Sequence, residues 1–135
     1  MLTGTFQLVD GSVTTAGTYV GDVITDLDGM TSVSFQARFS YGSGGTSLRL
    51  YVQTSLDQQQ SWIDIACLSF GTVSDVKVWG QNKADADGTL ITPSDGALTS
   101  NSTILGILGD SLRAKWVVVG TYATSTVLSA RAVVS

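Results

Sequence analysis

The chain has no histidine and no glutamate among its 135 residues. Without histidine, neither a Ser-His-Asp nor a Cys-His catalytic arrangement is available, and the commonest transition-metal ligand is missing. All 11 acids are aspartate, which favours turns, whereas glutamate favours helix. Together with 15 glycines and many serines and threonines, this composition disfavours helix and indicates a non-enzymatic β protein.

Cysteine and proline each occur once, as Cys67 and Pro93. A single cysteine cannot form an internal disulfide, and a zinc site needs several thiols or imidazoles. Because Cys67 lies in an alternating apolar segment, we expect it to be a buried small hydrophobe. The N-terminus MLTGTFQLVD lacks the basic and apolar regions of a secretory signal, so we expect the chain to be made and assembled in a cytoplasm.

Charge is also scarce, at 13% of residues, and no apolar run approaches the roughly 20 residues of a membrane helix. The seven basic residues do not cluster and the net charge is −4, which argues against direct nucleic-acid binding. A surface of neutral Ser, Thr, Gln and Gly suits a protein that packs against copies of itself or against partners.

Apolar and polar residues alternate with the period of two that is typical of half-buried β-strands. The pattern is clearest in 33–40, 47–54, 111–122 and 125–135, and shorter candidate strands occupy 5–10, 18–25 and 75–80. The hydrophobic content of 43% is enough for one core, so we predict a single domain over 1–135. The predicted fold is all-β: one antiparallel β-sandwich, jelly-roll-like, with about seven or eight strands.

Turn-forming sequences predict which strands are neighbours. The glycines of GSGG predict a hairpin between 33–40 and 47–54, and ATST predicts pairing of the two C-terminal strands. The segment 62–70 is apolar on both faces, which indicates a strand that is central or covered on its second side. We expect a long surface loop over 81–101 and a short helix within STILGILGD, at 103–109.

The octet SLDQQQSW lies between two predicted strands. It resembles the Asp-box turn of sialidases and other β proteins, Ser/Thr-x-Asp-x-Gly-x-Thr-Trp/Phe, through Ser55, Asp57, Ser61 and Trp62, with Gln59 in place of the glycine. The resemblance implies a structural hairpin in which the aspartate caps turn amides and the aromatic ring packs beneath. A short Asp side chain accepting nearby backbone N–H groups gives the same expectation.

Two longer segments, YVQTSLDQQQSWIDIACLSF (51–70) and ILGILGDSLRAKWVVVGTYATSTVLSARAVV (104–134), resemble small β-rich structural proteins of tailed bacteriophages and prophages. The resemblance implies a virion protein that acts by binding, as a capsid decoration or stabilising protein or as a neck or tail component. It further implies other virion proteins as partners, a homo-oligomeric or multicopy state, location in the virion and no cofactor. We expect contacts through sheet edges, the 81–101 loop and the N-terminal segment.

Acidic side chains offer weaker alternatives. A hydrolase would need two converging acids, and Asp57 and Asp64 are better explained as a turn acid and a strand residue. The pairs Asp26/Asp28 and Asp85/Asp87 suit the oxygen preference of calcium, but each lacks further ligands and is better explained by turn formation. GSGG at 42–45 lacks the lysine and helix of a phosphate-binding loop.

One aromatic is predicted to be exposed, at the end of a strand. Trp79, followed by Gln81, Asn82 and Lys83, is predicted to contribute to a subunit interface, where tryptophan is enriched. The alternative is a carbohydrate-binding module for a host-surface glycan, in which Trp79 stacks on a sugar.

Overall fold

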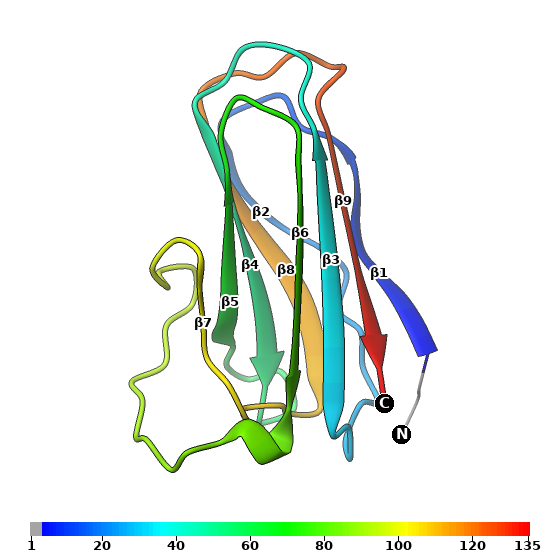
Figure 1. The fold of residues 1–135 in the computed structure, drawn as a ribbon, viewed down its shortest axis with the longest axis vertical. Helices are drawn as coiled ribbons and strands as arrows, with labels where there is room; N and C mark the ends of the chain where they lie inside the picture. The colour runs from blue at the N-terminus through cyan, green and yellow to red at the C-terminus, as the bar shows by residue number, and fades with distance from the viewer. Residues whose placement is uncertain (1–3) are drawn as a thin grey trace.

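A computed structural model of the chain describes residues 4–135 as two antiparallel β-sheets packed face to face (Figure 1). The first sheet has the order β1 (Gly4–Ser12), β9 (Val127–Val134), β3 (Ser32–Ser40) and β6 (Asp75–Asn82). The second has the order β2 (Gly17–Val20), β8 (Ser111–Val119), β4 (Ser47–Ser55), β5 (Ile63–Phe70) and β7 (Ser102–Thr103). The only helical element in the described part is the 3-10 turn η1 (Lys83–Asp85).

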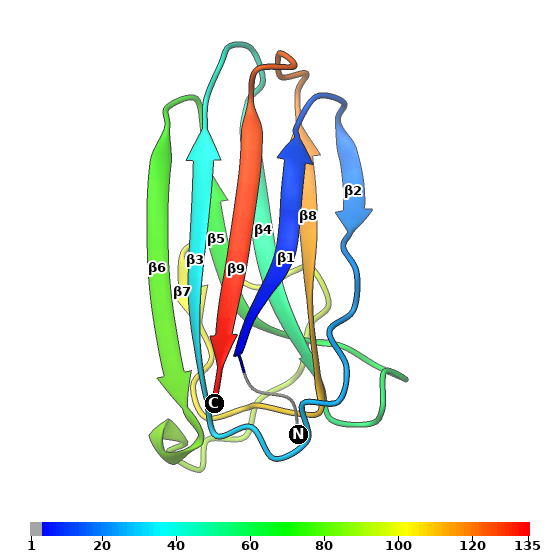
Figure 2. The same ribbon diagram turned by 90° about the vertical axis from the view of Figure 1, so that its right-hand side faces the viewer.

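This strand order confirms the predicted jelly-roll-like sandwich, with nine strands rather than seven or eight. The two four-stranded layers β1-β9-β3-β6 and β2-β8-β4-β5 have jelly-roll connectivity, and the two-residue β7 is an addition at one edge. The chain passes between the layers at most connections, as Figure 2 shows where β1 leads into β2. The exception in the main layers is the β4–β5 hairpin.

The core forms where the inward faces of the two layers meet. The predicted alternation of 33–40 is confirmed, because Val33, Phe35, Ala37 and Phe39 are buried while the intervening residues are exposed or half-buried. In the other layer, β4 contributes an equivalent buried apolar face, formed by Leu48, Leu50 and Val52. No helix among the described residues is long and apolar enough to cross a membrane.

The predicted hairpin between β3 and β4 is wrong. β3 pairs with β6 and β9, and β4 pairs with β5 and β8, so the connection 41–46 crosses from one sheet to the other. Its glycines are needed for a close approach: Gly45 has φ +69°, and a Cβ there would collide with the ring of Tyr122. Alternation shows which face of a strand is buried but not which strand lies beside it. Here the apolar faces of β3 and β4 oppose each other across the core.

The predicted pairing of the two C-terminal strands is wrong for the same reason. β8 lies between β2 and β4, whereas β9 lies between β1 and β3. The intervening turn carries the chain over the end of the sandwich, with Ala123 N–H donating to Ser43 O at 2.8 Å. The two crossing connections therefore pack on each other.

Three predicted boundaries also change. The segment 103–109 is not a helix, because Ile104 N–H bonds Ile65 O at a strand edge and Gly106 adopts φ +83°. The long loop begins after β6, which includes Gln81 and Asn82. Of the candidate strand 18–25 only β2 and an isolated bridge from Ile24 to Leu112 are present.

Candidate functional site

The β4–β5 hairpin contains the Asp-box-like turn that the sequence predicts. The carboxylate of Asp57 accepts a hydrogen bond from Ser61 N–H at 2.8 Å and another from Ser61 Oγ at 2.6 Å. These bonds, first that from the Ser61 hydroxyl, lower the pKa of Asp57. The Ser55 hydroxyl accepts from Gln59 N–H at 2.8 Å, and Arg113 lies over the Trp62 ring at 4.3 Å. Asp57 and Ser55 thus hold the turn through hydrogen bonds, and Trp62 contributes a contact between its ring and Arg113.

The glutamines of this turn adopt backbone angles that normally favour glycine. Gln58 has φ +57° and Gln59 has φ +73°, so the residue in the glycine position of the box keeps the left-handed conformation. Gln58 N–H is bound by the carboxylate of Asp110 at 3.1 Å. Side-chain capping of the amides therefore offsets the backbone strain of two non-glycine residues.

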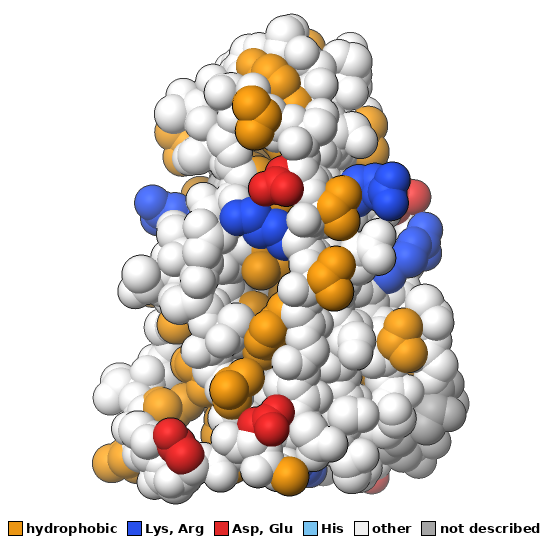
Figure 3. Space-filling view, viewed as in Figure 1, with side chains coloured by type: hydrophobic (Ala, Val, Ile, Leu, Met, Phe, Trp, Pro, Cys, Tyr) orange, Lys and Arg blue, Asp and Glu red, His pale blue; other side chains and the backbone are white. Residues whose placement is uncertain are grey.

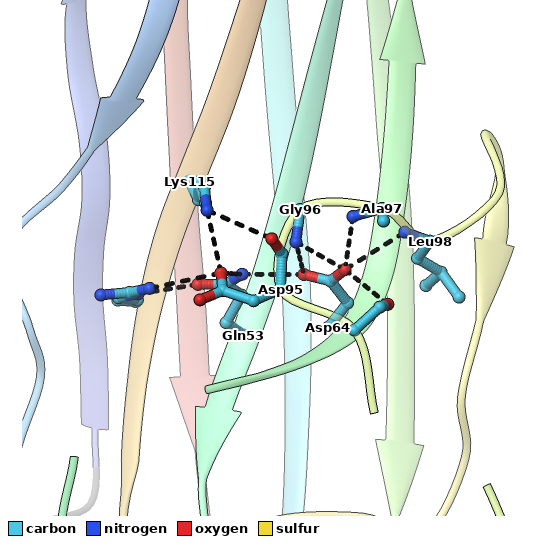
Figure 4. A network of polar contacts seen from close by, with 9 residues as sticks. Gln53, Asp64, Asp95, Gly96, Ala97, Leu98 and Lys115 are labelled. Atoms are coloured by element: carbon cyan, nitrogen blue, oxygen red, sulfur yellow. Dashed lines mark hydrogen bonds and ion pairs between the residues drawn. The ribbon is translucent and has the colours of Figure 1, made fainter. Parts of the chain in front are cut away.

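A buried aspartate anchors the long loop on the outer face of the second sheet (Figure 4). Asp64 has 0% exposure, and its carboxylate accepts hydrogen bonds from the backbone N–H groups of Gly96, Ala97 and Leu98 at 2.8–3.2 Å. The hydroxyl of Ser94 adds a bond at 2.9 Å. A buried carboxylate surrounded by donors in this way is stable only while the loop stays in place, so Asp64 fixes the position of residues 94–98.

A second acid extends this network across the sheet. Asp95 forms ion pairs with Lys115 at 3.0 Å and Arg113 at 3.5 Å, and it accepts from Gln53 Nε2 at 2.6 Å. Desolvation raises the pKa of Asp95, but the hydrogen bonds from Gln53 and Lys115 and the two positive charges outweigh it, so the pKa is lowered. Both carboxylates are therefore engaged in holding the loop.

The anchored loop presents an apolar groove, here called the loop groove, lined by 85–91, 103–105 and Ile107, with a volume of about 500 Å³. Leu90 at its rim is 97% exposed. Figure 3 shows hydrophobic side chains and an acid gathered at the lower left, where Figure 1 places this segment. Asp85 and Asp87 supply the carboxylates. Gly106 N–H donates a hydrogen bond to Gln81 Oε1 at 2.6 Å, which holds this segment to β6.

The outward side of the first sheet, here called the outer sheet face, carries a second, shallow groove of about 460 Å³. The strand register places its side chains in rows across β1, β9, β3 and β6. One row is Gln7–Arg131–Gln36–Val78, and the adjacent rows are Asp10–Ser129–Arg38–Val76 and Thr5–Val133–Ser34–Gly80. Within the described residues neither Arg38 nor Arg131 forms an ion pair.

The residues predicted as an interface do not form one exposed patch. Trp79 is half-buried and its ring stacks on Phe35 with 5.2 Å between centroids, so the expectation of an exposed tryptophan is wrong. Gln81 is buried, with its Nε2 unpaired among the described residues. Asn82 caps η1, in which Lys83 is exposed. The odd-numbered side chains of β6 point inward, which the short, weakly alternating sequence did not reveal.

The structure also places the remaining acids and the cysteine. Among the described residues no three acids or cysteines are grouped closely enough to hold a metal ion. Asp26 and Asp28 line a shallow hollow with Asp110 and the Gln58–Gln59 turn. Cys67 is fully buried, and desolvation raises the pKa of its thiol.

Sequence reasoning did not identify Asp64 as the loop anchor. Its only visible signal was a polar residue within an otherwise apolar strand, WIDIACLSF. A buried acid in such a strand requires several donors, but the donors lie 30 or more residues away in 94–98. Their identity depended on the path of the loop.

No protein-family model and no curated protein sequence matches the chain. The resemblance of 51–70 and 104–134 to phage structural proteins thus stays a prediction. Jelly-roll folds also serve unrelated functions, including viral capsid and lectin domains, so the fold by itself does not decide between binding partners.

Proposed function

We propose that the chain is a non-enzymatic structural protein of a tailed-phage virion, acting by protein–protein binding as a capsid decoration or stabilising protein or as a neck or tail component. The observation that carries this proposal is the outer sheet face. Val78 and Val133 are 71% and 49% exposed on a broad face of Ser, Thr and Gln that also bears Arg38 and Arg131. Apolar residues flanked by arginine, with few other charges, are typical of protein interfaces.

The free strand edges do not favour docking, in contrast to the expectation from sequence. Lys83 N–H bonds Thr31 O, so the odd-numbered amides of β6 face β3 and the even-numbered amides face the free edge. Of these, Val76 N–H is capped by Asp75 and Asn82 N–H by Asp85, each at 2.8 Å. Capping of this kind opposes the addition of another strand.

The other edges are also protected. β1 has an irregularity between Gln7 and Val9, while β2 has four residues and β7 has two. Short or bulged edge strands pair poorly with another chain. Of the expected N-terminal arm, residues 1–3 lie outside the described part, and from Gly4 onward the chain is paired with β9. Because the strand edges are protected, we favour docking through the sheet faces and the anchored loop.

The carbohydrate-binding alternative depended on an exposed Trp79, but this side chain is half-buried and its ring is stacked on Phe35. The most exposed aromatic is Tyr19 at 37%, on the short edge strand β2, with its ring stacked 6.0 Å from that of Trp116. Tyr19 lines neither the loop groove nor the groove of the outer sheet face, and a single partly covered ring does not favour sugar binding.

The experiment is to mix purified protein with capsids and tails from the tailed phage or induced prophage that carries its gene, and to look for added density by electron microscopy. We expect density on one of these particles, lost in Val78→Asp and kept in Val119→Asp, an equally polar change at an exposed valine of β8. Absence of binding to capsid, neck and tail would overturn the proposal, as would binding that Val78→Asp leaves unchanged.

A further inference from the structure

The loop groove and the outer sheet face lie on opposite sides of the molecule. The loop is fixed by Asp64, which lies beside Gln53 on the outward side of the second sheet. The outer sheet face is the outward side of the first sheet. In Figure 1 the loop after η1 runs on the flank of β5 and β7, whereas β1, β9 and β3 form the other flank. Because the two surfaces lie on opposite flanks, two different neighbours can bind the molecule at the same time, one on each flank.

The loop groove combines apolar side chains with negative charge. Leu90 is almost fully exposed and Ile91, Ile104 and Leu105 line the same groove. Asp85 and Asp87 lie at its edge, and hydrogen bonds from the side chain and the N–H of Thr89 lower the pKa of Asp87. Within the described segment 83–107, Lys83 in η1 is the only cation. The groove therefore keeps an excess of negative charge.

The outer sheet face combines apolar side chains with positive charge. Arg131 lies in a row with Gln7, Gln36 and Val78 that holds no acid. Arg38, in the next row, shares it with Asp10, so the face keeps an excess of positive charge. The two surfaces are complementary because each has exposed apolar side chains and their charges are of opposite sign.

We propose that the loop groove of one molecule docks on the outer sheet face of a second copy, with Asp87 opposite Arg131 and Asp85 opposite Arg38. Leu90 then packs against Val78 and Val133, and the contact removes these three exposed side chains from water. This proposal rests on the proposed function in one respect: for most copies the neighbour on the outer sheet face is another copy of this chain, and the molecule at the end of a row keeps that face free for a capsid or tail.

The contact has a consequence for symmetry. The two surfaces lie on opposite flanks, so one pair of molecules cannot make both contacts at once, and the association is head-to-tail rather than a closed two-fold dimer. Repetition of the same contact gives a ring or an open row of subunits. Sedimentation velocity of the full chain should therefore show species larger than a dimer as concentration rises, with weaker association at high salt because the ion pairs are screened.

A charge exchange tests the contact. Asp87→Lys and Arg131→Glu should each weaken self-association about tenfold or more, because each places like charges together. The double variant Asp87→Lys/Arg131→Glu should recover most of the wild-type association. Leu90→Ala should weaken it by a similar factor without changing its dependence on salt.

Two control variants carry the same charge changes at other exposed positions. Asp22→Lys, beside β2, and Arg49→Glu, on the outward side of the second sheet, should associate like the wild type. All substitutions are at exposed residues, and circular dichroism verifies that each variant is folded. Lack of self-association in the wild type, or failure of the double variant to recover what the single variants lose, would overturn the head-to-tail contact.

These results are separable from the test of virion function. A protein that binds capsids or tails but stays monomeric contradicts the head-to-tail contact and keeps the virion role. A protein that self-associates through these surfaces but binds no particle contradicts the virion role and keeps the contact.

Discussion

Gln53 donates from its side-chain amide to Asp64 at 2.8 Å and to Asp95 at 2.6 Å, and its carbonyl oxygen accepts from Arg113 at 2.7 Å. One fully buried amide thus joins the buried anchor of the long loop to the ion pairs on its surface. Because Gln53 lies between Asp64 and Arg113 in the strand register, the network spans β5, β4 and β8. The position of the loop is therefore coupled to the centre of the second sheet.

Replacement of Asp64 by alanine should release the loop. It leaves the N–H groups of Gly96, Ala97 and Leu98 without their acceptor in a buried setting, so we expect a loss of about 3 kcal/mol or more in the free energy of unfolding. Urea denaturation measures the loss, and hydrogen exchange should show lower protection at 96–98. Asp87→Ala, which removes one exposed cap on Thr89, should cost far less. Equal losses in both variants would contradict the anchoring role.

Stability should fall in acid because two aspartates have lowered pKa values. The pKa of Asp57 and that of Asp95 are below the ordinary 3.8 in the folded protein, so their contribution is present above 3.8 and is lost as the pH falls through the lower folded values. Thermal melts should be nearly constant from neutral pH to about pH 5 and decline below about pH 4. Asp95→Asn should flatten this decline by at most about 1 kcal/mol, since its side chain is 47% exposed. An unchanged acid profile in Asp57→Asn/Asp95→Asn would contradict the prediction.

Gln59→Gly should stabilise the hairpin. Gln59 holds φ +73°, a conformation that costs a side-chain-bearing residue about 1 kcal/mol and costs glycine little. We expect an increase of about 0.5 kcal/mol in the free energy of unfolding after the greater entropy of the unfolded glycine is subtracted. Gln60→Gly, two residues before Trp62 and outside the left-handed region, should instead reduce stability. A destabilised Gln59→Gly variant would mean that the side chain contributes more than the strain costs.

Alanine substitution at three glycines should separate steric from conformational demands. Gly45 has a positive φ and no room beside Tyr122, Gly88 has φ +81° with open space, and Gly71 has open space without a positive φ. We expect Gly45→Ala to cost about 2 kcal/mol or more, Gly88→Ala about 1 kcal/mol, and Gly71→Ala little. Chemical denaturation of the three variants measures this order, and equal costs for Gly45 and Gly88 would show that the crossing loops adjust freely.

The sequence alone determined the class of fold and the local devices. The absence of glutamate, the abundance of glycine and the period-two alternation specified strands and their buried faces, because these depend on residues next to one another. The Asp57 turn was readable for the same reason: its donors and acceptor lie within four residues of each other.

Apart from the β4–β5 hairpin, only the tertiary structure decided which strands are neighbours and what the long loop does. A strand with one apolar face fits equally well beside a partner or across the core from it, so nothing local distinguished the β3–β4 crossing from a hairpin. In the same way, the donors of Asp64 lie 30 to 34 residues away and reach it only because the loop passes over β5. Contacts between distant segments depend on the path of the whole chain, and that path fixes where the apolar groove and the arginine-bearing face lie.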